Sequence, residues 1–275
     1  MANKMTLQTV VKKHNPFINS VQMLYKWNVS VATILIIEAI VLVGISVHRN
    51  LSITTSYLTT NPLASTASGG SVTAVASRHL FNLDLAYLIA VFLVFSGIFH
   101  GLSAGYYRKR YESDLKKRIN WLRWIGYGLS LGLMLVTTGL IAGIYDISSL
   151  IMIFILGLGL ALVGLMVELQ GGIASSLSKL SAIIGGLSGA AVLITFIFYI
   201  VSSSGFGGKA LPRFAYFIFW TMLIVFASLL VNLYLEIKNW KKWSNYFYVE
   251  RIYIAIIFIA QTALAWQVFA GMLHR

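Results

Sequence analysis

Seven apolar stretches, each about 20 residues long, dominate the chain and limit what it can fold into. They lie near residues 27–47, 84–107, 119–143, 148–168, 182–203, 213–236 and 250–273. Runs of this length match the ~30 Å of hydrocarbon in a bilayer, where every backbone polar group needs an internal partner. The pattern predicts an all-α membrane protein, with a single seven-transmembrane helix bundle as one domain over residues 1–275.

The composition favours the same class of protein. Of the 275 residues, 58% are hydrophobic and 11% are charged, as is typical of membrane proteins. The net charge of +13 raises the question of nucleic-acid binding. However, the basic residues lie between the apolar runs, where they indicate membrane flanks, so no nucleic-acid partner is expected. The absence of cysteine excludes disulfides and thiolate chemistry.

The distribution of basic residues predicts how the chain is oriented. Sixteen of the 21 Lys and Arg residues fall on the side of the N-terminus and five on the other side. Because short cytoplasmic loops carry the excess of Lys and Arg, we expect a multi-pass cell-membrane protein with a cytoplasmic N-terminus and an extracellular C-terminus. The opening residues show no pattern of a cleavable signal peptide. The basic stretch Arg108 to Arg123 is interpreted as a topology determinant and a contact for anionic lipid.

One connection, residues 48–83, is long and would lie outside the cell. It contains β-branched stretches at 52–60 and 72–77, separated by Asn-Pro and Gly-Gly turn chemistry. This pattern predicts an external β-hairpin, and a disordered linker is the alternative.

Several motifs resemble one family of membrane proteins. The chain carries "RWIGYGLS" at 123–130, "GLMVE" at 164–168, "LAWQVFAG" at 264–271, and His100 in the second apolar stretch. In these motifs and in its inverted orientation the chain resembles the heliorhodopsins, which are microbial-rhodopsin-like proteins. The resemblance covers most of the chain and is clearest over residues 231–273.

The resemblance implies a retinal site from which two chemical groups have been lost. In the family, a lysine of the seventh helix binds retinal as a Schiff base, and a buried carboxylate pairs with the protonated imine. The resemblance places Gln261 at the lysine position and Gly126 at the carboxylate position. An amide cannot form an imine, and no other lysine lies in the middle of an apolar stretch. We therefore expect no covalent cofactor, although retinal or another apolar ligand could bind non-covalently.

Two groups of residues are candidates for function. Aromatic residues that could line the former retinal pocket are Tyr127, Trp220, Phe226 and Trp266. Ionisable residues inside membrane spans are functional candidates by default, and Glu38, His100, Arg123 and Gln261 could form one internal polar cluster on the cytoplasmic side of the midplane. The alternative is that Glu38 and His100 each form hydrogen bonds with nearby groups, and that the Arg123 side chain snorkels to the membrane interface. No spacing indicates a metal site.

These patterns favour a non-enzymatic sensory, signalling or scaffold protein, because no set of side chains for catalysis stands out. The alternatives are a protein that holds retinal or another apolar ligand non-covalently, and a transporter or channel. The expected partners are the lipid bilayer, a second copy in a homodimer, and an unidentified soluble cytoplasmic protein. Small residues four apart, Gly157 with Ala161 and Gly185 with Gly189, allow close helix contacts either between copies or within one.

Overall fold

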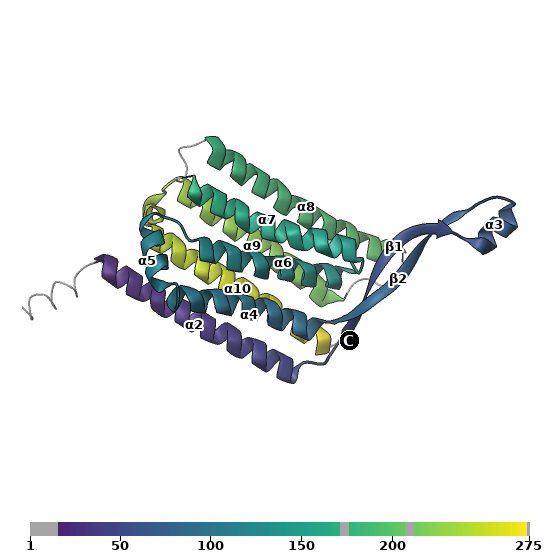
Figure 1. Cartoon of the computed structure of the whole chain (residues 1–275), viewed down its shortest axis with the longest axis horizontal. Coiled ribbons are helices and arrows are strands. Elements are labelled where there is room, and N and C mark those ends of the chain that lie inside the picture. The colour runs from purple at the N-terminus through teal and green to yellow at the C-terminus, as the bar shows by residue number, and fades with distance from the viewer. Residues whose placement is uncertain (1–15, 171–175, 207–211, 274–275) are drawn as a thin grey trace, which may run out of the picture.

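Seven helices long and apolar enough to cross a membrane make up most of the computed structural model, which describes residues 16–170, 176–206 and 212–273. They are α2 (Pro16–Ile45), α4 (Leu85–Ala104), α6 (Trp121–Ala142), α7 (Ile147–Leu169), α8 (Ser176–Phe206), α9 (Arg213–Ile237) and α10 (Tyr246–Leu273). Figure 1 shows them side by side in one bundle, with a β-hairpin projecting from one end. The predicted fold class is confirmed. Helices α2 and α8 begin earlier than predicted, because polar residues near a helix end lower hydropathy without breaking the helix.

Helix α6 is the most buried of the seven and packs between α4 and α7. Small residues let α6 and α7 approach closely. A Cβ placed on Gly157 would lie 2.8 Å from the Cα of Gly132, and one placed on Gly128 would lie 3.1 Å from the Cβ of Ala161. The small residues of α7 therefore serve packing within one copy of the chain, which is the second of the two roles considered for them.

The hairpin pairs β1 (Asn50–Thr60) with β2 (Thr73–Asp84) in antiparallel register, from Asn50 opposite Asp84 to Thr60 opposite Thr73. The predicted hairpin is confirmed, but its turn contains a short helix, α3 (Pro62–Ser68). Asn61 caps this helix by accepting a hydrogen bond from the Ala64 N–H at 3.1 Å. The Asn-Pro pair thus supplies an N-cap and a first helical residue, a role that suits both residue types.

The hairpin is fixed to the bundle at the turn between α6 and α7. The Thr54 N–H donates to the Tyr145 carbonyl at 3.0 Å, and the Ser56 N–H donates to the Asp146 carboxylate at 2.8 Å. Asp146 also caps α7 by accepting from the Ser148 N–H at 3.0 Å. These backbone hydrogen bonds, above all the one from Ser56, lower the pKa of Asp146. One carboxylate therefore anchors both a strand and a helix.

The bundle has two chemically different ends. The hairpin and the end of α10 lie at one end, here called the hairpin end (Figure 1). The opposite end, here called the basic end, carries α5 (Arg108–Lys116) and the short helix η1 (Lys241–Ser244). Both of these connecting helices are rich in Lys and Arg.

Candidate functional site: a buried ion cluster beside an apolar cavity

A buried arginine near the basic end forms ion pairs with two carboxylates. Arg123 lies in the first turn of α6, where Asn120 caps the helix by accepting from the Arg123 N–H at 3.0 Å. The Arg123 guanidinium pairs through Nη2 with Glu168 at the end of α7 and through Nη1 with Glu250 near the start of α10. All three charged side chains are buried. With a single guanidinium between two carboxylates, this cluster has more acidic than basic groups.

Neutral donors complete the hydrogen bonding of the two carboxylates. Asn120 donates its backbone N–H to Glu168 at 2.9 Å and its side-chain amide to Glu250 at 2.6 Å. The Tyr246 hydroxyl donates to Glu168 at 3.0 Å, and the Tyr111 hydroxyl donates to Glu250 at 3.2 Å. Burial raises the pKa of Tyr111, so its hydroxyl keeps the proton that it donates.

His100 joins this cluster through two intermediates. Its Nδ1 donates to Asn28 Oδ1 at 2.7 Å, and the Asn28 amide donates to the Tyr111 hydroxyl at 3.2 Å. His100, Arg123 and Gly126 also line one small cavity of about 20 Å³, which is large enough for a single water. The structure thus brings His100 and Arg123 into one polar site, as the sequence suggested.

Glu38 and Gln261 do not belong to this site. The Glu38 carboxylate accepts from Thr262 at 2.9 Å and from Trp266 Nε1 at 3.3 Å, so it ties α2 to α10. Among the described residues Glu38 makes no ion pair with Arg123, so the prediction that Glu38 and Arg123 belong to one internal polar cluster is wrong. Gln261 is fully buried, and neither of its amide atoms has a partner in the described part of the chain.

Neither ion-pair partner of Arg123 was predicted from the sequence. Glu168 and Glu250 stand at the last and first positions of predicted spans, where a charged residue is normally taken as a flank in contact with water. A sequence signal for them existed. Glu168, Glu250 and Arg123 all lie near the same membrane face in the predicted topology. A buried arginine there could therefore be expected to pair with these two carboxylates.

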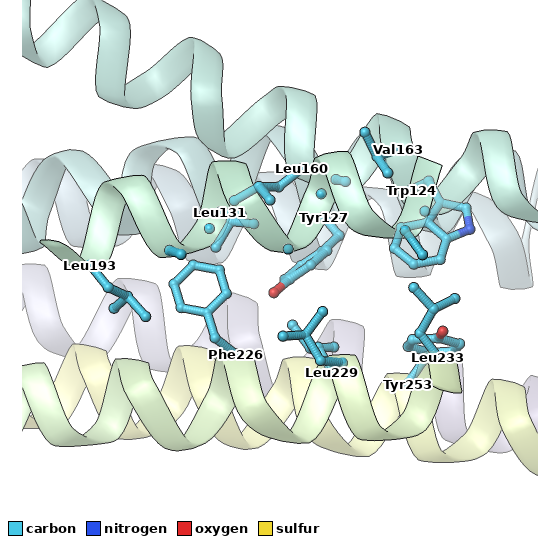
Figure 2. Close-up of a pocket in the computed structure, with 18 residues that line it drawn as sticks. Trp124, Tyr127, Leu131, Leu160, Val163, Leu193, Phe226, Leu229, Leu233 and Tyr253 are labelled. Carbon is cyan, nitrogen blue, oxygen red and sulfur yellow. The ribbon is translucent and has the colours of Figure 1, made fainter. Parts of the chain in front are cut away.

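An apolar cavity of about 170 Å³ lies beside the ion cluster, between α6, α7, α8 and α9, with Tyr253 of α10 at one end. Figure 2 shows Leu, Val and aromatic side chains converging on it from facing helices. Of the pocket residues proposed from sequence, Tyr127 and Phe226 line this cavity. Trp220 and Trp266 do not, because Trp220 is 57% exposed and Trp266 donates its indole N–H to Glu38.

Two aromatic residues belong to both the cavity and the ion cluster. Trp124 and Tyr253 line the cavity and meet edge to face, with ring centroids 5.3 Å apart. The Arg123 guanidinium carbon lies 4.7 Å from the centre of the Trp124 ring and 4.1 Å from that of the Tyr253 ring, which is within the range of cation–π attraction. The cavity wall is therefore in direct contact with the ion cluster.

The space beside Gly126, the residue that the resemblance places at the carboxylate position, is already filled. A Cβ at Gly126 would lie 2.4 Å from the Cβ of Phe99, so the phenylalanine of α4 packs directly on the glycine backbone. Gln261 does not line the apolar cavity. Each lysine in the described ranges is exposed, and Lys4, Lys12, Lys13 and Lys209 lie outside those ranges.

These features define a multi-pass membrane protein whose seven-helix bundle encloses an apolar cavity next to a buried ion cluster. The chain belongs to the heliorhodopsin family, whose model matches residues 24–273 and so includes most of the first span and all of the other six. This confirms the family resemblance of the sequence motifs. In general the family binds retinal. Comparison with curated proteins gives no match to this chain.

Proposed function

We propose that this chain is a heliorhodopsin without covalent retinal that acts as a non-enzymatic membrane sensor or signalling protein. The proposal is supported by the two residues that the family resemblance places at the lysine and carboxylate positions. Gln261 is buried and has no amine, and the Phe99 side chain covers Gly126, which has no carboxylate.

The residues present do not fit a retinal held through an imine. A Schiff base needs a primary amine, which the Gln261 amide does not provide. The exposure of every lysine in the described ranges supports the same conclusion. A protonated imine would also lack a carboxylate partner beside Gly126, since Glu168 and Glu250 are already engaged with Arg123.

The contact between the cavity and the ion cluster offers a physical route for a signal. A molecule that enters the cavity would press on Trp124 and Tyr253, and both rings pack against the Arg123 guanidinium. Arg123 in turn holds the ends of α7 and α10 through Glu168 and Glu250. We propose that the basic end faces the cytoplasm, where a soluble partner would read this change, and that the protein works as a homodimer in the bilayer.

The test of the proposal is absorption of the purified protein after addition of all-trans retinal. We expect no red-shifted band of a protonated imine, and no gain of retinyl mass after borohydride reduction. The variant Gln261→Lys supplies the missing amine as a matched control. Because Gly126 offers no carboxylate, any imine that this variant forms should remain unprotonated. A red-shifted band or a retinyl adduct in the unmodified chain would overturn the proposal.

A second candidate function is non-covalent binding of retinal or another apolar ligand, which the apolar cavity favours. Retinal held in this way would keep an absorption band near that of free retinal and would remain with the protein through gel filtration. Loss of that band during gel filtration would argue against retinal as the ligand.

A further inference from the structure

We infer that the groove between α2 and α10 docks a transmembrane helix of another membrane protein, and that this helix carries a lysine or an arginine near its middle. Glu38 would pair with this cation, and the indole of Trp266 would lie beside it. A partner embedded in the membrane goes beyond the proposed function, and its binding does not depend on whether the chain holds retinal.

The depth of Glu38 in the membrane is the first observation behind this inference. Glu38 lies eleven residues after Trp27, which is ~16 Å along a helix that rises 1.5 Å per residue. This distance places its carboxylate near the middle of a hydrocarbon layer that is ~30 Å thick. Charged side chains at such a depth are rare, and almost all of them face the interior of a bundle or a water-filled cavity.

Glu38 instead lies in a groove on the lipid-facing surface. Helix α2 runs along one edge of the bundle and packs on α4 and α10 (Figure 1). Glu38 is half-buried, and its neighbours Ile34, Ile37 and Val41 are exposed on the outer side of α2. Across the groove, Trp266 of α10 is 38% exposed. A second helix that lies along this groove would therefore reach the carboxylate.

The contacts of Glu38 satisfy its hydrogen bonding but not its charge. The Thr262 hydroxyl and the Trp266 indole N–H donate to the carboxylate at 2.9 and 3.3 Å, and both donors are neutral. Among the described residues Glu38 forms no ion pair. The basic residues of these two helices, Lys26 and Arg251, lie toward the basic end. Because a carboxylate without a cation is costly in hydrocarbon, the complement of this surface is a positive charge.

The indole of Trp266 favours the same kind of partner. Its N–H donates to Glu38, so the ring and the carboxylate lie side by side and can contact one cation together. Lys and Arg side chains are attracted to the face of Trp more strongly than to other aromatic rings. A transmembrane helix brings such a cation to this depth with its own backbone fully hydrogen-bonded. The charged head group of a lipid remains at the interface, ~15 Å away.

The experiment measures how the full chain associates with two synthetic transmembrane helices in liposomes. Each probe is a Leu-Ala helix of about 24 residues, and the two probes differ only in the central residue, which is arginine or methionine. A donor dye on Val47→Cys, at an exposed position after α2, reports energy transfer to a dye on the probe. We expect the arginine helix to bind about tenfold more tightly than the methionine helix.

Variants of the chain separate recognition from folding. Glu38→Gln can still accept hydrogen bonds from Thr262 and Trp266, so it should keep its thermal unfolding midpoint while it loses the preference for the arginine helix. Glu38→Lys should prefer a probe with a central glutamate. Trp266→Leu should reduce the arginine preference about threefold. The matched control is Glu112→Gln, which removes an exposed carboxylate of α5 and should leave the preference intact.

Equal binding of the two probes, or an arginine preference that survives in Glu38→Gln, would overturn the inference. Displacement of the arginine helix by oleylamine at equal concentration would assign the groove to a free lipid amine instead. Loss of self-association in Glu38→Gln would assign it to a second copy of the chain. None of these readouts involves retinal, so their failure leaves the proposed function in place, and a protonated-imine band would leave the docking groove in place.

Discussion

At the scale of single residues, Arg123 has the largest energetic consequence. Its guanidinium is buried between Glu168 and Glu250 and packs on the rings of Trp124 and Tyr253. Burying charges costs several kcal/mol per ion, and only close pairing and hydrogen bonding offset this cost. Loss of Arg123 would therefore leave two buried carboxylates without their cation.

The variant Arg123→Met should lower the free energy of unfolding by about 3–5 kcal/mol, because two buried carboxylates lose their cation. Denaturant or thermal unfolding in detergent measures this effect. The control is Arg108→Met, which breaks an exposed pair with Glu112 four residues along α5 and should cost less than about 1 kcal/mol. Equal losses in the two variants would contradict the ion cluster described above.

Gln261 should behave in the opposite way. Its buried amide has no partner among the described residues, so Gln261→Met should stabilise the protein by about 1–3 kcal/mol through removal of an unsatisfied polar group. Gln267→Met is the comparison, since the Gln267 amide nitrogen donates to Thr221 at 2.7 Å and only its oxygen lacks a partner among the described residues, so the gain should be smaller. A lower unfolding midpoint for Gln261→Met would show that the amide has partners in solution.

At the scale of helices and strands, apolar length and turn residues were sufficient to predict seven spans and the hairpin. The same signals could not place Glu168 and Glu250, because a charged residue at the edge of an apolar run looks the same whether it meets water or a buried arginine. Periodicity also missed α3, since seven residues are too short for a hydrophobic pattern. Contacts between residues far apart in the sequence determine such details, and a short stretch of sequence does not contain them.

The approach of α6 and α7 can be tested with two glycines of the same helix. Gly157→Ala should destabilise the protein by about 1–3 kcal/mol, because the new methyl group would meet the backbone of Gly132 at 2.8 Å. Gly159→Ala meets nothing within 4 Å and should be neutral or stabilising by up to ~1 kcal/mol. The thermal unfolding midpoints of the two variants test this prediction, and equal midpoints would contradict the close contact between α6 and α7.

The attachment of β1 to α7 should depend on pH. Hydrogen bonds from Ser56 and the first turn of α7 hold the pKa of Asp146 below its usual 3.8. The contribution of this carboxylate is therefore complete above that pH and is lost as pH falls through the lowered pKa. The Ser56 amide resonance should report a midpoint below 3.8, and Asp146→Ala should remove the transition. A midpoint above the usual value would contradict the assignment.

At the scale of the whole molecule, the charge difference between the two ends predicts how the bundle sits in the membrane. Because the natural chain has no cysteine, single cysteines can be placed without background. Leu63→Cys at the hairpin tip, where Leu63 is 85% exposed, should react with a membrane-impermeant maleimide on intact cells. Lys109→Cys at the basic end should react only after permeabilisation. The reverse pattern would overturn the proposed orientation.

The packing of Phe99 against Gly126 also limits which side chains position 126 can accept. A Cβ there would lie 2.4 Å from the Cβ of Phe99, so any larger residue, a carboxylate included, requires a smaller side chain in place of Phe99. Under the proposed function, a protonated imine would therefore require changes at positions 261, 126 and 99 together, and no single substitution would produce one.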